Sequence, residues 1–125
     1  MKLEFLPSGS SDCPLIRLFQ FNDEEVIRLK SFFDSLSNSS VSDLALHEAP
    51  WIEQVNACQL YLRIGKSNLG VRTVGPGNFE CVLTCAAWDD MACLVEPFCK
   101  PRASGYQWLG RSFGMNLLLT RDGKW

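Results

Sequence analysis

The stretch from residue 102 to residue 113 interleaves cationic and aromatic side chains around two glycines. Its members are Arg102, Tyr106, Trp108, Arg111 and Phe113, and Trp51 and Trp125 add two more large rings elsewhere in the chain. Tyrosine, tryptophan and arginine are enriched at the energetic centres of protein interfaces, and rings beside cations also stack on nucleic-acid bases. We therefore predict a binding surface here, for a protein in the first place. The competing interpretation buries Trp108 and Phe113 in the core.

The thiol best placed for catalysis is Cys85, at a predicted junction between a strand and a helix. Unpaired amides and the positive end of the helix dipole favour the thiolate at such a position. Asp89 and Asp90 follow within the next turn, and their negative charges disfavour the thiolate. A nucleophile also needs a base, and the single histidine, His47, is predicted on a different strand. A thiol-dependent enzyme or redox sensor using Cys85, with His47, is kept as an alternative function.

Two glycine motifs resemble phosphate-binding turns without meeting their requirements. Gly65-Lys66-Ser67 lacks the glycine that a P-loop carries five residues earlier, because position 60 is leucine. A hairpin turn is predicted after it, where a P-loop needs a helix. Gly75-Pro76-Gly77 is too short for a dinucleotide-binding turn. We expect no cofactor.

The six cysteines are predicted to be reduced and mostly buried. If Cys81 and Cys85 share one strand, their Cα atoms lie about 13 Å apart, whereas a disulfide needs less than about 7 Å. Neither Cys81/Cys85 nor Cys93/Cys99 has the two-residue spacing typical of zinc sites. We therefore expect no metal site.

The net charge of −2 is small, but it is unevenly distributed. Residues 1–96 hold 7 Lys/Arg against 13 Asp/Glu, whereas residues 97–125 hold 5 Lys/Arg against one acid. We expect the basic segment to lie beside the acidic start of the first helix. The alternative is that it forms a surface for nucleic acid or another anion.

Composition and length indicate one folded domain over residues 1–125. Hydrophobic residues make up 46% of the chain and charged residues 21%, which excludes a disordered class. No run approaches the ~18 apolar residues of a membrane span, and the first residues lack the apolar region of a secretory signal. We expect a soluble protein of the cytoplasm with no membrane partner.

Two helices are predicted. Asn22 and Glu25 have the spacing of a capping box, and apolar residues then recur at helical intervals, which predicts a helix over 23–36. A second helix is predicted from 86 to about 95, ending before Pro97.

The strands are predicted from alternating or continuous apolar runs. They cover residues 2–6, 15–21, 41–48, 59–65, 69–74, 79–85, 106–109 and 116–120. The pairs 2–6/15–21 and 59–65/69–74 are interpreted as hairpins. The fold class is therefore α+β: a mostly antiparallel sheet of about six to eight short strands, with two helices packed on one face.

The function favoured by these patterns is that of a small non-catalytic cytosolic protein that binds another macromolecule. It would act as an adaptor, an inhibitor or an immunity-type module. The alternatives are the Cys85 chemistry and the binding of nucleic acid or another anion by the basic C-terminal segment.

Overall fold

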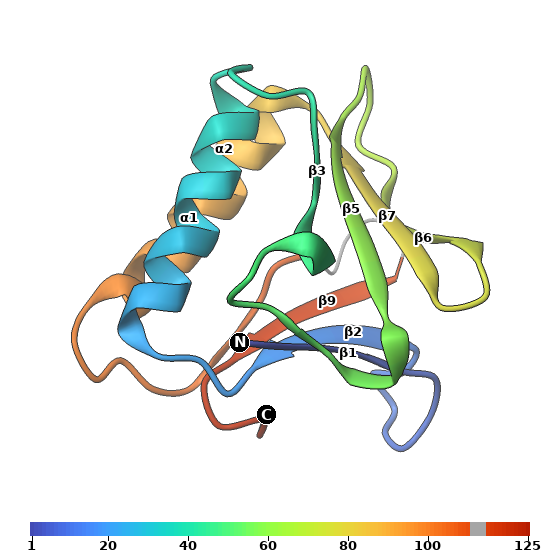
Figure 1. The fold of residues 1–125 in the computed structure, drawn as a ribbon, viewed down its shortest axis with the longest axis vertical. Coiled ribbons are helices and arrows are strands. Elements are labelled where there is room, and N and C mark those ends of the chain that lie inside the picture. The colour runs from blue at the N-terminus through green and yellow to red at the C-terminus, as the bar shows by residue number, and fades with distance from the viewer. Residues whose placement is uncertain (111–114) are drawn as a thin grey trace.

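The computed structural model describes residues 1–110 and 115–125, and these residues form an α+β structure with two α-helices and two β-sheets (Figure 1). The predicted class and the two helices are confirmed. The prediction of a single, mostly antiparallel sheet is wrong, because the described strands divide into two sheets and each sheet mixes parallel with antiparallel pairs.

The first sheet has five strands in the order β4-β1-β2-β9-β8. Its strands are β1 (Lys2–Leu6), β2 (Leu15–Phe19), β4 (Glu53–Gln54), β8 (Tyr106–Trp108) and β9 (Asn116–Thr120). The predicted N-terminal hairpin is confirmed as the antiparallel pair β1–β2. β2 also pairs in parallel with β9, which comes from the other end of the chain, and β8 forms the edge beside β9.

The second sheet has four strands in the order β3-β5-β7-β6. Its strands are β3 (Asp43–Ala45), β5 (Gln59–Ile64), β6 (Gly70–Gly75) and β7 (Asn78–Leu83). The strand predicted over 41–48 is shorter than expected, because the chain turns into the 3-10 helix η1 (Leu46–Glu48).

The predicted hairpin between residues 59–65 and 69–74 is wrong, because β7 lies between these two strands and pairs with both. Residues Phe79–Leu83 are all buried, and a strand that is buried on both faces takes a central place in its sheet. The connection after β5 also bonds to the end of β7: the side-chain oxygen of Asn68 accepts the Thr84 amide at 2.9 Å.

The helices are α1 (Asp23–Ser37) and α2 (Cys85–Val95). The predicted capping box is confirmed: the Glu25 amide donates to the Asn22 side chain at 2.9 Å, and the Asn22 amide donates to the Glu25 carboxylate at 3.0 Å. α2 ends before Pro97 as predicted, and a 3-10 turn, η3 (Glu96–Cys99), follows it. A further 3-10 turn, η2 (Val55–Ala57), precedes β5.

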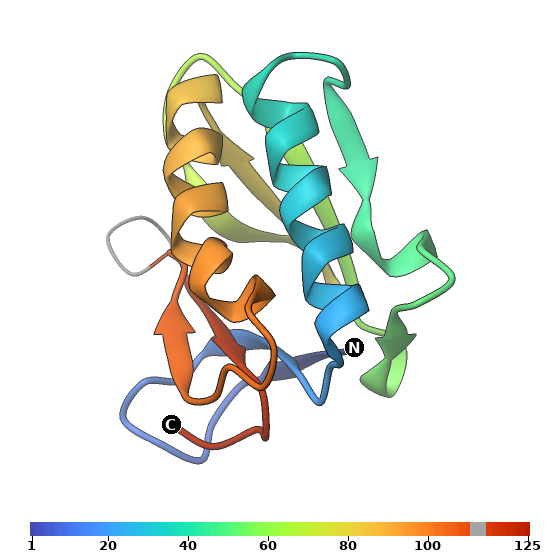
Figure 2. The ribbon, with the colours of Figure 1, turned by 90° about the vertical axis from the view of Figure 1, so that its left-hand side faces the viewer.

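The two helices lie side by side against the four-stranded sheet, and the five-stranded sheet closes one end of the same core (Figures 1 and 2). Trp88 of α2 is fully buried, packs on Phe33 of α1 and donates its indole N–H to the Arg63 carbonyl of β5 at 3.0 Å. The rings of Phe5 and Phe79, 4.6 Å apart, join the two sheets. Within the described residues, no helix has the length and apolar character needed to cross a membrane.

Candidate functional site

The edge strand β8 places two of the predicted binding residues on one side. Tyr106 and Trp108 alternate with Gln107, so both rings leave the same face of the sheet. Their partners across the strand pair are Thr120 and Leu118. The β9 residues Leu117 and Leu119, which alternate with these partners, belong to the main core. Tyr106 and Trp108 therefore lie on the opposite face of the sheet, which points away from that core.

A tail of residues 121–125 is fixed over this outer face by Arg17 of β2. The Arg17 guanidinium donates to the Gly123 carbonyl at 3.0 Å and to Glu4 at 2.7 Å, and it stacks on Phe19 with 3.9 Å from its central carbon to the ring centre. Gly123 has φ +84°, a left-handed conformation that favours glycine. These contacts set where Trp125, two residues further on, can lie.

The loop between β1 and β2 supplies the other wall. The Asp12 carboxylate accepts the indole N–H of Trp125 at 3.1 Å, and the Asp12 amide donates to the Ser10 hydroxyl at 3.2 Å. The side-chain amide of Asn116, at the start of β9, donates to the Asp12 carbonyl at 2.8 Å. The loop and the tail are thus held against the same sheet from opposite ends of the chain.

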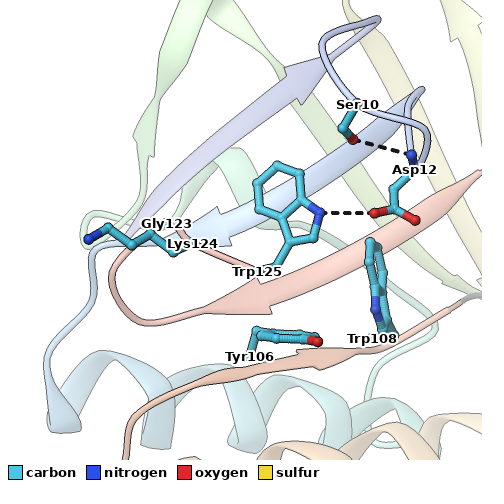
Figure 3. A pocket seen from close by; sticks show the side chains of 7 residues that line it. All are labelled: Ser10, Asp12, Tyr106, Trp108, Gly123, Lys124 and Trp125. Atoms are coloured by element: carbon cyan, nitrogen blue, oxygen red, sulfur yellow. Dashed lines mark hydrogen bonds between the residues drawn. The ribbon is translucent and has the colours of Figure 1, made fainter.

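Together these segments form an open hollow of about 540 Å³, here called the aromatic pocket. Its lining residues are Ser10, Asp12, Tyr106, Trp108, Gly123, Lys124 and Trp125. Figure 3 shows the Trp125 ring nearly face-on and the rings of Tyr106 and Trp108 nearly edge-on, so the three rings face the hollow from different directions. The Lys124 side chain extends away from them. The volume lies in the range of small-ligand sites, roughly 300–1,000 Å³.

The predicted binding surface is therefore brought together in part. Tyr106 and Trp108 line the aromatic pocket, and Trp108 is half-buried. Arg102 is exposed in the loop before β8 and is not among the lining residues. Arg111 and Phe113 lie outside the described residues.

Of the other large rings, Trp125 joins the pocket, whereas Trp51 packs on Phe32 of α1, with ring centres 5.4 Å apart. Ser10, Asp12 and Lys124 were not predicted. Nothing in their local sequence indicates a site, because they meet the rings through the long-range pairing of β2 with β9.

The structure does not bring Cys85 and His47 together. Cys85 begins α2, is half-buried and lies 3.2 Å from the Ser39 hydroxyl. His47 is buried in η1, where its Nδ1 accepts the Leu60 amide at 3.1 Å. Leu60 pairs with Phe79 near the start of β7, whereas Cys85 follows the end of that strand, more than about 13 Å further along the sheet. His47 is not placed to act as a base for this thiol.

A second, more apolar hollow of about 260 Å³ lies between α2 and the four-stranded sheet. Its lining includes Cys81, Met91 and Leu109. Burial raises the pKa of the Cys81 thiol to about 12, so this thiol is protonated at neutral pH and is no nucleophile. Among the residues that the structure describes, no group of three histidine, cysteine or acidic side chains is placed to hold a metal ion.

The basic C-terminal segment contacts the acidic start of α1 through Arg121, as expected. Its guanidinium donates to Asp23 at 2.9 Å and to the Phe21 carbonyl at 3.2 Å. Arg121 therefore stabilises the fold, and its charge is partly neutralised by Asp23.

No protein family model, no curated protein and no solved structure matches this chain. The geometry and chemistry of the site therefore carry the functional proposal.

Proposed function

We propose that this protein is a non-catalytic binding module and that it contacts another macromolecule through the aromatic pocket. The observation that carries the proposal is the gathering of Tyr106, Trp108 and Trp125 around one open hollow. Tyr106 is 51% exposed and Trp125 is 37% exposed, so two large rings remain in water although the chain has a well-filled core. Exposed rings of this kind, once desolvated by a partner, supply most of the energy of an interface.

A protein partner is favoured over a nucleic acid by the charges around the pocket. The Asp12 carboxylate lines the hollow, and a carboxylate has no hydrogen to donate to a phosphate backbone. Two nearby cations, Arg17 of β2 and Arg121 just after β9, already pair with Glu4 and Asp23. The basic C-terminal segment is therefore a weaker candidate for an anion-binding surface than its net charge indicates.

The thiol-dependent alternative receives less support. Cys85 has a serine hydroxyl beside it, and the ring of the single histidine is held at another place in the fold. A catalytic thiol requires a group that takes its proton. The free thiols nevertheless favour a reducing compartment, and we propose the cytoplasm.

A photo-crosslinker placed at position 106 tests the binding function directly. p-Benzoylphenylalanine at Tyr106 should give a discrete adduct in the native cells of this protein, because position 106 faces the partner. The same group at Ile27, which is 48% exposed on α1, is the matched control and should give none. Digestion of the adduct with protease or nuclease identifies the class of partner, and we expect sensitivity to protease alone.

The adduct must also depend on the pocket. Trp125→Leu in the position-106 protein should reduce the yield of this adduct severalfold while the circular dichroism spectrum stays unchanged. No adduct at position 106, or equal adducts at positions 106 and 27, would overturn the proposal. A nuclease-sensitive adduct would replace the protein partner with a nucleic acid.

A further inference from the structure

We infer that the aromatic pocket receives a cationic side chain of the partner protein, an arginine or a methylated lysine. This inference rests on the proposed function and adds the chemistry that the partner must offer. It follows from the orientation of the three rings, from the acid that holds one of them, and from the way this protein places its own cations.

The ring arrangement suits a compact cation. An aromatic ring carries negative charge on its faces and positive charge at its edge, so a cation is attracted to the face. In Figure 3 the Trp125 ring is seen nearly face-on and the rings of Tyr106 and Trp108 nearly edge-on, so the rings are oriented differently, and all three line the same hollow. A base or a sugar stacks best on a single flat platform, whereas rings turned toward one another surround a rounded group. Pockets of this kind bind methylated ammonium groups.

The Asp12 carboxylate strengthens this preference. It accepts the indole N–H of Trp125 at 3.1 Å, which fixes the orientation of that ring. A negative charge at the indole edge also increases the electron density on the ring faces. Lys124 lines the hollow too, but its side chain extends away from the three rings and leaves their faces open.

The protein's own cations show the same chemistry on other rings. Within the described residues, the guanidinium groups of Arg17, Arg63 and Arg121 lie 3.9, 4.9 and 4.9 Å from the ring centres of Phe19, Tyr61 and Phe21. In the part of the chain that the structure describes, no cation is placed in this way over Tyr106 or Trp125. Tyr106 and Trp125 are both exposed, so their rings are accessible to a cation of the partner.

The test compares capped pentapeptides, Gly-Gly-X-Gly-Gly, in which X is arginine, trimethyllysine or the neutral norleucine. Binding is followed by NMR through the indole N–H signals of the four tryptophans. We expect the two cationic peptides to shift the Trp125 and Trp108 signals saturably, and the buried Trp88 to be unaffected. The norleucine peptide should bind at least about tenfold more weakly, which corresponds to ~1.4 kcal/mol, within the range expected for a cation over several rings.

Variants locate the cation. Tyr106→Leu and Trp125→Leu keep an apolar side chain but remove the ring, and each should weaken the cationic peptides about three- to tenfold. Ile27→Ala is the matched surface control and should leave their affinity unchanged. Folding of each variant is checked by its thermal midpoint.

Equal binding of the norleucine and cationic peptides would overturn the inference, as would no shift at either pocket tryptophan up to 10 mM peptide. Saturable binding of a proline-rich peptide or of cellobiose in place of the cationic peptides would assign another occupant and would also overturn it. Each of these results leaves the crosslinking experiment to decide the proposed function separately. Conversely, if the cationic peptides bind but no macromolecular adduct forms, the pocket's preference for a cation would stand and the proposal of a macromolecular partner would be rejected.

Discussion

At the scale of single residues, the six cysteines occupy different environments. All six are free thiols, but only Cys58 and Cys81 are buried; three are half-buried and Cys93 is exposed. The prediction that most of them are buried is therefore wrong. Four of the six thiols are not buried because they lie in α2, in η3 or in the β1–β2 loop, and the outer sides of these segments face water.

We predict that Cys93 is alkylated first and Cys81 last. Burial raises the pKa of Cys81 to about 12, and burial together with the nearby Glu4 raises that of Cys58 to about 11. At pH 8 neither thiol is ionised to a useful extent, and the thiolate is the reactive form. Iodoacetamide labelling of the folded protein, read by mass spectrometry of its peptides, should modify Cys93 within minutes and Cys81 only in denaturant. Labelling of Cys81 at the rate of Cys93 would contradict the burial.

Glu80 is a buried acid held between two arginines. Its carboxylate accepts from Arg72 at 2.6 Å and pairs with Arg63 on its other oxygen. Burial alone would raise the pKa of Glu80, but the hydrogen bonds from Arg72 and Arg63 outweigh it and hold the pKa below its usual value. A lowered pKa contributes stability above the pKa of the unfolded state, and this stability is lost as the pH falls through the folded pKa.

We predict that Glu80→Gln destabilises the protein at pH 7 by about 1.5–3 kcal/mol, the size of a hydrogen bond to a charged group. The deficit should shrink as the pH is lowered through the folded pKa of Glu80, because the wild-type carboxylate then becomes protonated too. Urea unfolding at pH 7 and at an acidic pH measures it. Glu53→Gln is the control, because Glu53 is exposed and faces Lys2 across 3.7 Å. An equal deficit at the two pH values would show that the negative charge of Glu80 does not account for its contribution to stability.

At the scale of elements, the start of α1 was predictable from sequence because its signal is local. Asn22 and Glu25 are three residues apart and satisfy each other's backbone amides. The order of the four-stranded sheet was not predictable in this way. The sequence of residues 59–65 and 69–74 predicts two strands joined by a short turn, and no local feature shows that β7 inserts between them.

We predict that Asn22→Ala lowers the free energy of unfolding by about 0.5–2 kcal/mol, because the Glu25 amide loses its acceptor. Asn22→Asp keeps an acceptor oxygen and should restore most of the loss. Ser31→Ala, on the exposed side of the same helix, serves as the control. Chemical denaturation of the three variants measures the differences, and an unchanged midpoint for Asn22→Ala would contradict the observed cap.

The tail that carries Trp125 depends on Gly123. A Cβ at this position would lie 3.3 Å from the Phe19 ring and 3.4 Å from the Arg17 guanidinium, at φ +84°. Gly105 is a matched control, because it has φ +90° with no atom within 4 Å of the added Cβ. Both Gly→Ala changes carry a backbone cost of roughly 1–2 kcal/mol, but only Gly123→Ala also crowds the tail.

We therefore predict that Gly123→Ala is the more destabilising of the two and that it moves Trp125. The indole N–H resonance of Trp125 should shift as its hydrogen bond to Asp12 is disturbed. Under Gly105→Ala the same resonance should stay in place. Equal effects of both variants would mean that the tail tolerates the added methyl group.

At the scale of the whole molecule, both sheets and both helices contribute to one hydrophobic core. Leu3, Leu18 and Leu119 of the five-stranded sheet belong to the same cluster as Leu62 and Phe79 of the other sheet. Neither sheet can lose its packing without exposing residues of the other. The aromatic pocket is likewise a property of the whole molecule, which is why sequence reasoning found its β8 rings but not Asp12.

We predict that the chain unfolds in one transition. Tryptophan fluorescence, which reports Trp88 in the core and Trp125 in the tail, should change with the same midpoint as the far-ultraviolet circular dichroism signal. The calorimetric and van't Hoff enthalpies should agree. Two separated midpoints would instead divide the chain into independently stable parts.

The parallel pairing of β2 with β9 has a consequence for the order of events during synthesis. Asp12 and Asn116, which are joined by a hydrogen bond, are 104 positions apart in the chain. The hairpin β1–β2 therefore leaves the ribosome with one side of β2 open and must wait for β9. An open strand edge of apolar residues recruits other chains, and non-local pairing of this kind forms slowly. Nascent chains stalled before residue 116 are expected to bind chaperones or aggregate, whereas chains released at full length escape both fates.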